Sequence, residues 1–267
     1  MIEILVGAAL TSLILGVMGA FFVASRNFAQ QEVLRVETTQ ALRSSMDNLT
    51  RDLRLSGACL PVTGNFVSLG GTNSGTLDAV VTRTGVLRSD LSCVRTTLSA
   101  AVLATTTTLP VVSANGFASG TRVYLRNPNG TGELFTLTGA QTSNNTLLKT
   151  GALSAGYPIG SGVYAVDERQ YGIDTTNAAL PVLTVALNGN APMQFASGIE
   201  SVNVQYELQR NCPPCDVVDL PQTDNEWAMV KQLFVNITAR SRVPGWGGQY
   251  IRLSGQIGVK PRNLVPK

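Results

Sequence analysis

The sequence predicts an α+β protein in which a long N-terminal α-helix packs on an antiparallel β-sheet head that carries a β-rich insertion. About the first 55 residues keep apolar side chains at helical spacing, with no proline before Pro61. After Gly57, short β-branched runs are separated by Gly, Asn and Pro, which is typical of antiparallel strands. With 44% hydrophobic and 14% charged residues, the 267-residue chain has the composition of a folded protein.

Composition also excludes several classes of function. The chain has no histidine, which removes serine–histidine and cysteine–histidine catalysis and imidazole metal sites. Its 20 basic and 17 acidic residues are spread along the chain, so the sequence shows no basic patch for duplex nucleic acid. Ordinary hydrolase chemistry and binding of duplex nucleic acid are therefore not expected. We also expect a protein that is not an enzyme and needs no cofactor.

The N-terminal segment predicts a membrane span. No charged residue occurs from Ile4 to Ala24, and a helix of about 20 such residues crosses the roughly 30 Å apolar layer of a bilayer. The run is too long for the apolar part of a secretory signal, and no Lys or Arg precedes it. Arg26, Arg35 and Arg43 alone would place the following segment in the cytoplasm, whereas the cysteines favour an oxidising compartment. A basic leader preceding this sequence would reconcile the two.

The helix is predicted to continue past the apolar run as an amphipathic helix that lies on the sheet. Gly57 is well placed to end it. The predicted organisation is a membrane half at 1–25, an amphipathic half at 26–57 and a globular head at 58–267. Charged residues, Asp52 among them, are predicted to occupy the faces turned away from the sheet. The apolar positions at helical spacing are Phe28, Val33, Leu42, Met46, Leu49 and Leu53.

Short runs with alternating polarity predict the strands of the head. The segment 98–165 is rich in Thr, Ser, Gly and Asn and is predicted to be a β-rich insertion beside the main sheet. In the strand at 233–240, the side chains predicted to face the helix are Leu233, Val235, Ile237 and Ala239. The other predicted strands are 76–81, 121–126 and 133–137 around a turn at 127–132, 146–150, 163–173, 183–187 before an Asn188-Gly189 turn, 199–206 and 251–259.

The N-terminal pattern resembles type IV pilins and pseudopilins. The opening Met1-Ile2-Glu3-Ile4-Leu5-Val6, followed by an apolar helix, is similar to the processed N-terminus of that family, and Glu3 matches the family's glutamate. Mature chains of the family usually begin Phe-Thr-[Leu/Met]-Ile-Glu. This sequence lacks the Phe-Thr pair, the glycine before the cleavage site and the basic leader, so cleavage is inferred only from the resemblance.

The C-terminal part resembles the PilW-type minor pilins, with the J-type minor pseudopilin of type II secretion next. The matching segments are Gly198 to Tyr206, Trp227 to Val230, Val235 to Arg242 and Tyr250 to Val259. The resemblance covers about the first 57 and last 70 residues. It implies a minor pilin in the tip or priming complex that initiates pilus assembly and displays or supports a tip adhesin. The expected partners are other minor pilins and the major pilin, met through the N-terminal helix, and a large tip adhesin.

The resemblance also implies a location. The chain is expected in the bacterial inner membrane as a single-pass protein with a periplasmic head, and after assembly at the pilus tip on the cell surface. Two alternatives remain open from the sequence. One is a minor pseudopilin of a type II secretion system, and the other is a membrane-tethered periplasmic binding or thiol-redox protein.

Glu3 and three glycines are the predicted assembly residues. The resemblance implies that Glu3 pairs with the free α-amino group of a neighbouring subunit, which would set the axial register because an isolated buried charge is costly. The alternative is a carboxylate at headgroup level that starts a membrane helix. Gly7, Gly16 and Gly19 would permit close approach of helices.

The four cysteines are predicted to form two structural disulfides. Sequence alone allows three pairings, and we favour Cys59 with Cys93, tying the helix end to the sheet, and Cys212 with Cys215, clipping a loop. Cys212-Pro213-Pro214-Cys215 also has thioredoxin-type spacing. Its surroundings neither favour a thiolate nor continue a helix, and a zinc site would need a second ligand pair.

Two C-terminal loops are candidate binding features. Asp216, Asp219 and Asp224, with Glu226 nearby, are candidate calcium ligands, although a solvated acidic loop without metal is the expected outcome. Trp246 lies in a Pro- and Gly-rich loop. It is either an exposed contact residue or a side chain folded back on the sheet edge.

Overall fold

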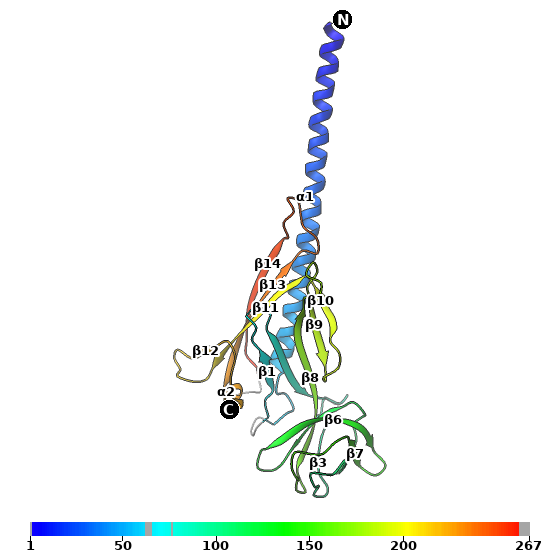
Figure 1. Ribbon diagram of the computed structural model, residues 1–267, viewed down its shortest axis with the longest axis vertical. Coiled ribbons are helices and arrows are strands. Elements are labelled where there is room, and N and C mark those ends of the chain that lie inside the picture. The colour runs from blue at the N-terminus through cyan, green and yellow to red at the C-terminus, as the bar shows by residue number, and fades with distance from the viewer. Residues whose placement is uncertain (1, 62–65, 76, 262–267) are drawn as a thin grey trace.

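One long helix projects from a β-rich head in the computed structural model (Figure 1). The structure describes residues 2–61, 66–75 and 77–261, so Met1 and Thr76, which belong to predicted features, lie outside the described residues. Helix α1 spans Ile2–Leu55 and confirms the predicted rod, about 80 Å long at 1.5 Å per residue. Gly57 follows with φ 81°, a left-handed conformation that glycine adopts without strain and that ends helices.

A four-stranded antiparallel sheet packs against α1. The helix contacts β13 and β14, and the predicted inward-facing side chains of β13, from Leu233 to Ala239, are fully buried. The strands predicted in this part are confirmed, with ends shifted by a few residues. One short strand, β12, falls where a loop was predicted. In spatial order the strands are β12 (Asp216–Val218), β11 (Ile199–Leu208), β13 (Val230–Arg240) and β14 (Arg252–Val259).

Only part of the predicted apolar stripe on α1 faces the head. Leu42, Leu49 and Leu53 are buried in a core shared with the four-stranded sheet. Phe28 and Val33 are exposed, so their prediction as sheet-facing residues is wrong. Where α1 leaves the head, the half-buried positions are Asn27, Gln31 and Leu34, whereas the apolar side chains of Phe28, Val33 and Val36 are exposed. The helix therefore carries a second apolar face that this chain does not cover.

A larger antiparallel sheet contacts α1 through β2 and β10. The predicted hairpin at 121–137 and the Asn188-Gly189 turn are both present. The strand predicted at 76–81 begins later, because the backbone N–H of Asp78 bonds to Val202 of β11 instead of continuing the ladder. The elements are β1 (Leu69–Thr72), β2 (Ala79–Gly85), β3 (Arg95–Thr97), β4 (Thr108–Pro110), β5 (Arg122–Arg126), β6 (Gly132–Gln141), β7 (Thr146–Lys149), β8 (Gly162–Asp174), β9 (Val182–Leu187), β10 (Met193–Ser197) and helix α2 (Asp224–Ala228).

Strand β8 connects two hydrophobic cores. Its first part pairs with β3 and β5, and its second part pairs with β9. Val163 and Ala165 belong to a core drawn from Val94 to Ala165, whereas Tyr171 belongs to the core around α1. We call the residues 94–165 the distal body, because they lie at the end of the molecule away from the N-terminus (Figure 1). The segment predicted as an insertion, 98–165, falls within this body.

Candidate interaction surface

The candidate functional surface is the part of α1 that leaves the head. Every residue from 2 to 26 whose side chain is described is exposed, and Asn27 is the first half-buried residue. At 1.5 Å per residue the projection is roughly 37 Å long. The side chain of Phe21 is 76% exposed and that of Phe22 is 70% exposed. A contiguous apolar surface of this kind marks contact with a membrane or another protein, and the helix is long and apolar enough for a membrane span or a signal sequence.

The three predicted assembly glycines lie on this projection but not on one side of it. Outside the adjoining backbone of α1, a Cβ atom added at Gly7, Gly16 or Gly19 would meet no heavy atom within 4 Å, so no packing contact inside this chain requires glycine there. Gly16 and Gly19 are three residues apart and share a face. Gly7 precedes Gly16 by nine residues, about half a turn out of phase. Gly16 and Gly19 could therefore admit one close neighbour, while Gly7 would face a different one.

Glu3 lies in the first turn of α1, far from the head. A carboxylate there is favoured by the positive end of the helix dipole, whether or not a partner subunit is present. No ion pair to Glu3 occurs among the residues that the structure describes. Its predicted pairing partner belongs to another chain, and that role stays a prediction.

The opposite end of α1 is fixed by the buried carboxylate of Asp52, so its prediction as a residue facing away from the sheet is wrong. Asp52 is 5% exposed and accepts hydrogen bonds from Tyr171 and, at 3.0 Å, from the Arg169 guanidinium. Burial and the bond to Asp52 raise the pKa of Tyr171. Burial lowers the pKa of Arg169, but the charges of Asp52 and Asp167 outweigh it and the net shift is upward. Residue 52 continues the buried series 38, 42, 45 and 49 at spacings of three and four, a signal that could have identified it.

Replacing Asp52 with alanine is expected to lower the unfolding free energy by about 2–3 kcal/mol. The substitution leaves the Tyr171 hydroxyl without its acceptor and removes the charge facing Arg169, whose partial exposure limits that part of the loss. Chemical unfolding of the full chain in detergent measures the change. Asp47→Ala, at an exposed position five residues earlier, is the matched control and should change stability by no more than about 0.5 kcal/mol. Equal stability of both variants would contradict an anchoring role for Asp52.

Both disulfides form with the favoured partners, Cys59 with Cys93 and Cys212 with Cys215. The second closes the connection between β11 and β12, so it clips a loop as predicted. Lys231 Nζ lies 3.4 Å from Cys215 Sγ, and a neighbouring cation favours a thiolate. However, β12 rather than a helix follows the pair, so the helix N-terminus that activates thioredoxin-type cysteines is not supplied here.

The carboxylates of the acidic loop bind protein groups and do not converge on a metal site. Asp216 and Glu226 both accept hydrogen bonds from Arg210, at 2.7 and 2.9 Å, and Asp219 accepts one from a glutamine side chain at 3.0 Å. A backbone N–H and the Arg210 guanidinium lower the pKa of Glu226. Across 2–61, 66–75 and 77–261, no three acidic or cysteine residues lie together as a metal site. Arg210, which no pattern in the sequence indicates, joins β12 to α2 through these two carboxylates.

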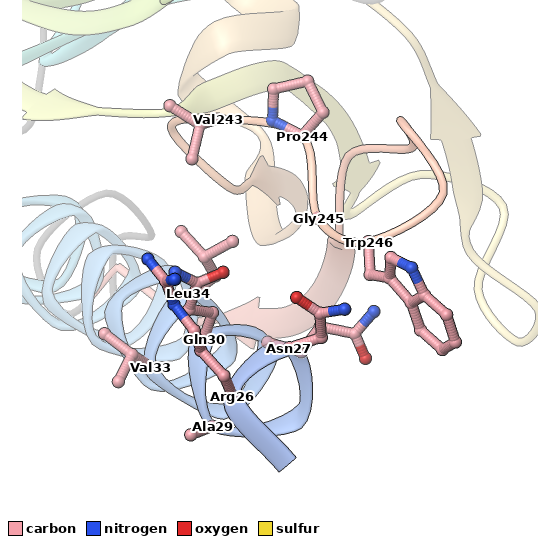
Figure 2. Close-up of a pocket in the computed structure, with 11 residues that line it drawn as sticks. Arg26, Asn27, Ala29, Gln30, Val33, Leu34, Val243, Pro244, Gly245 and Trp246 are labelled. Atoms are coloured by element: carbon pink, nitrogen blue, oxygen red, sulfur yellow. The ribbon is translucent and has the colours of Figure 1, made fainter. Parts of the chain in front are cut away.

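Trp246 is exposed, so the interpretation in which it folds back on the sheet edge is wrong. Its side chain is 73% exposed, in the loop between β13 and β14. This loop and α1 enclose a groove of about 580 Å³, and Figure 2 shows Trp246 at its rim beside Asn27. The groove lies where the exposed half of α1 meets the head.

Comparison with known proteins adds no assignment. No protein-family model matches the chain, and a search of the curated proteins finds no match. The function is therefore inferred from the projecting helix, its anchor in the head and the exposed surfaces beside it.

Proposed function

We propose that the protein is a structural subunit of a type IV pilin-like filament, a minor pilin of the complex that initiates pilus assembly. The observation that carries this proposal is the division of α1 into two halves. One half stands clear of the head with its apolar side chains exposed, and the other is held in the core by Leu49, Leu53 and Asp52. Such a helix can wait in a bilayer and later exchange lipid for neighbouring helices, because lipid tails and leucine side chains are similarly apolar.

A single continuous helix supports a filament subunit over a simple membrane tether. A tether needs only the apolar span and a linker of any conformation. Here the span continues without interruption through 54 residues into the core of the head, so movement of the apolar half is transmitted to the head. Helices packed side by side would thereby arrange the heads in a fixed order.

The distal body favours a pilus over a secretion pseudopilus. It has its own hydrophobic core and lies at the end farthest from the N-terminus of α1 (Figure 1). If the N-terminal ends of the helices point toward the base of the filament, the distal body of the last subunit stands at the tip. There it could support an adhesin or contact other minor pilins. A minor pseudopilin of type II secretion is the alternative, and it would have less need of such a displayed surface.

Deletion of the gene is expected to reduce the number of surface pili at least severalfold and to leave type II secretion intact. The physical reason is that an initiating complex lacking one helix presents an incomplete surface to the next subunit. Pilus counts and secretion assays on the deletion strain, restored by the wild-type gene, measure this. Co-purification from detergent should recover other pilin-like subunits. A monomeric protein whose loss changes neither process would refute the filament proposal, and a secretion defect with normal pili would support the pseudopilin alternative.

A further inference from the structure

The loop between β13 and β14 is held against α1 at the point where the helix leaves the head (Figure 1). A Cβ atom added at Gly245 would lie 3.8 Å from the Gln31 side chain, so the loop is in contact range of the helix. The loop is closed by the backbone bond from Gly245 to Gln249, at 2.8 Å, and at its base the Ser241 hydroxyl donates to the carbonyl oxygen of Val243, at 2.7 Å. These bonds fix the loop beside the helix.

The apolar side chains of this loop are turned outward. Val243 is 51% exposed and Trp246 is 73% exposed. Figure 2 shows the Trp246 indole beside Asn27 and directed away from Val243 and Pro244. Neither the groove nor another part of the head buries the ring. An exposed tryptophan on a closed loop is a candidate for contact with something outside this chain.

The position of the Trp246 loop along the axis of α1 indicates what the ring contacts. Asn27 and Gln31 lie beside the loop and follow Ala24, the last residue of the apolar run, by three and seven residues. The axial distance is about 5–10 Å at 1.5 Å per residue. The headgroup layer on each side of a bilayer is about 5–7 Å thick, the difference between the full thickness and the apolar core. If the run from Ile4 to Ala24 crosses the bilayer, the Trp246 loop lies at the level of the headgroups.

The charged side chains around the loop are also compatible with the phospholipid headgroup layer. Three exposed arginines, Arg26, Arg35 and Arg242, stand near it against two exposed glutamates, Glu32 and Glu37. Glu32 is 4.0 Å from Arg35. Within the described part of the chain, Arg26 and Arg242 have no carboxylate within ion-pair distance. Guanidinium groups can bind lipid phosphates, while a tryptophan ring lies between the phosphates and the acyl chains. Segments at the membrane interface combine these two residue types.

We propose that the loop Val243–Gly248 is an interfacial anchor that places Trp246 in the phospholipid headgroup layer while α1 spans the bilayer. This inference rests on the membrane-inserted state in the proposed function. The projecting helix by itself could rotate about its axis in the lipid. A second contact, held to one side of the helix, fixes the rotation of the subunit and the height of its head before assembly.

The chain contains only two tryptophans, which makes a direct test possible. Trp227 lies in α2, away from the end of the head where α1 emerges, and packs edge-on against Tyr206 with ring centroids 5.0 Å apart (Figure 1). The full chain is reconstituted in vesicles of phosphatidylcholine and phosphatidylglycerol, with part of the phosphatidylcholine brominated near the top of its acyl chains. Trp227→Phe leaves Trp246 as the only reporter, and Trp246→Phe leaves Trp227 as the control inside the same head.

Bromolipid is expected to quench Trp246 emission at least twofold and to leave Trp227 emission unchanged. Lipid brominated near the chain ends should quench Trp246 less. If Trp227→Phe fails to fold, the difference between wild type and Trp246→Phe supplies the same measurement. Alkaline extraction distinguishes loss of the membrane span from loss of the anchor alone. Release of the protein from the vesicles would overturn both the span and the anchor, whereas a retained protein whose Trp246 is quenched no more than Trp227 would overturn the anchor alone.

Discussion

Replacing both Cys59 and Cys93 with serine is expected to lower the unfolding free energy by about 4 kcal/mol, the largest stability loss expected in the head. The disulfide closes a loop with a sequence separation of 34, and loop-closure entropy in the unfolded chain rises with the logarithm of loop length. The two cysteines also lie at a junction. Cys59 follows the end of α1, and Cys93 directly precedes Val94, where the core of the distal body begins.

The second disulfide is the matched control for this prediction. Cys212 and Cys215 have a sequence separation of 3, so their replacement by serine is expected to cost only about 2 kcal/mol. Chemical unfolding of wild type and both variants in detergent gives the two differences under identical conditions. A greater loss from the Cys212 and Cys215 pair would show that loop length does not decide the order. Such a result would indicate that local contacts of this pair, such as that between Lys231 and Cys215, stabilise the head more than closure of the longer loop does.

The Cys59–Cys93 link bears on how the molecule works as well as on its stability. Gly85 of β2 packs so closely on Cys59 that an added Cβ atom would lie 2.5 Å from its side chain. Two backbone hydrogen bonds join the same segments. The N–H of Gly57 donates to the carbonyl oxygen of Arg83, and the N–H of Gly85 donates to the carbonyl oxygen of Ala58. The end of α1 is therefore held to β2 and the distal body at once. A force on the projecting helix would reach the distal body through this junction and through β8.

The elements that could be predicted from the sequence are those with a long uninterrupted local pattern. β13 has neighbours on both sides and a helix on one face, so its side chains from Leu233 to Ala239 follow the two-residue period of a strand without interruption. The length of α1 could also be predicted, because no proline or glycine occurs between Gly19 and Gly57. For β13, local pattern and tertiary packing agree. For α1, the local pattern predicts the length of the helix but not which of its apolar side chains the head covers.

The predictions failed where a distant partner decides the environment. Asp52 has the charge of a surface residue, and only Arg169 and Tyr171, more than 110 residues away, make its burial possible. Phe28 has the character of a core residue, but the head does not cover its side of α1. The exposure of Trp246 likewise depends on the conformation of the glycine-rich loop between β13 and β14, which sequence periodicity does not describe. Single-sequence periodicity carries no information on such pairings.

Substituting Glu3 with alanine is expected to leave folding, membrane insertion and both disulfides intact while reducing incorporation into the filament at least tenfold. Glu3 lies in the first turn of the projecting helix, so its loss removes no contact with the head. In a bundle of apolar helices, exchange of lipid for protein is nearly neutral in apolar area, so close packing and the charge pair must supply the preference. A carboxylate facing the α-amino group of the next subunit would penalise every stagger that leaves either charge unpaired.

Site-specific crosslinking to the neighbouring subunit measures this effect. Leu10→Cys places a reporter two turns from Glu3 on the exposed helix, and both pairs of native cysteines are already joined as disulfides. Glu3→Gln keeps the length of the side chain and removes its charge, so it should fail as alanine does if the charge pair sets the register. If Glu3→Gln assembles normally while Glu3→Ala fails, size rather than charge matters at this position. Unchanged crosslinking and pilus number in both variants would remove the assembly role of Glu3, and the favourable position of a carboxylate at the helix N-terminus would then account for the residue.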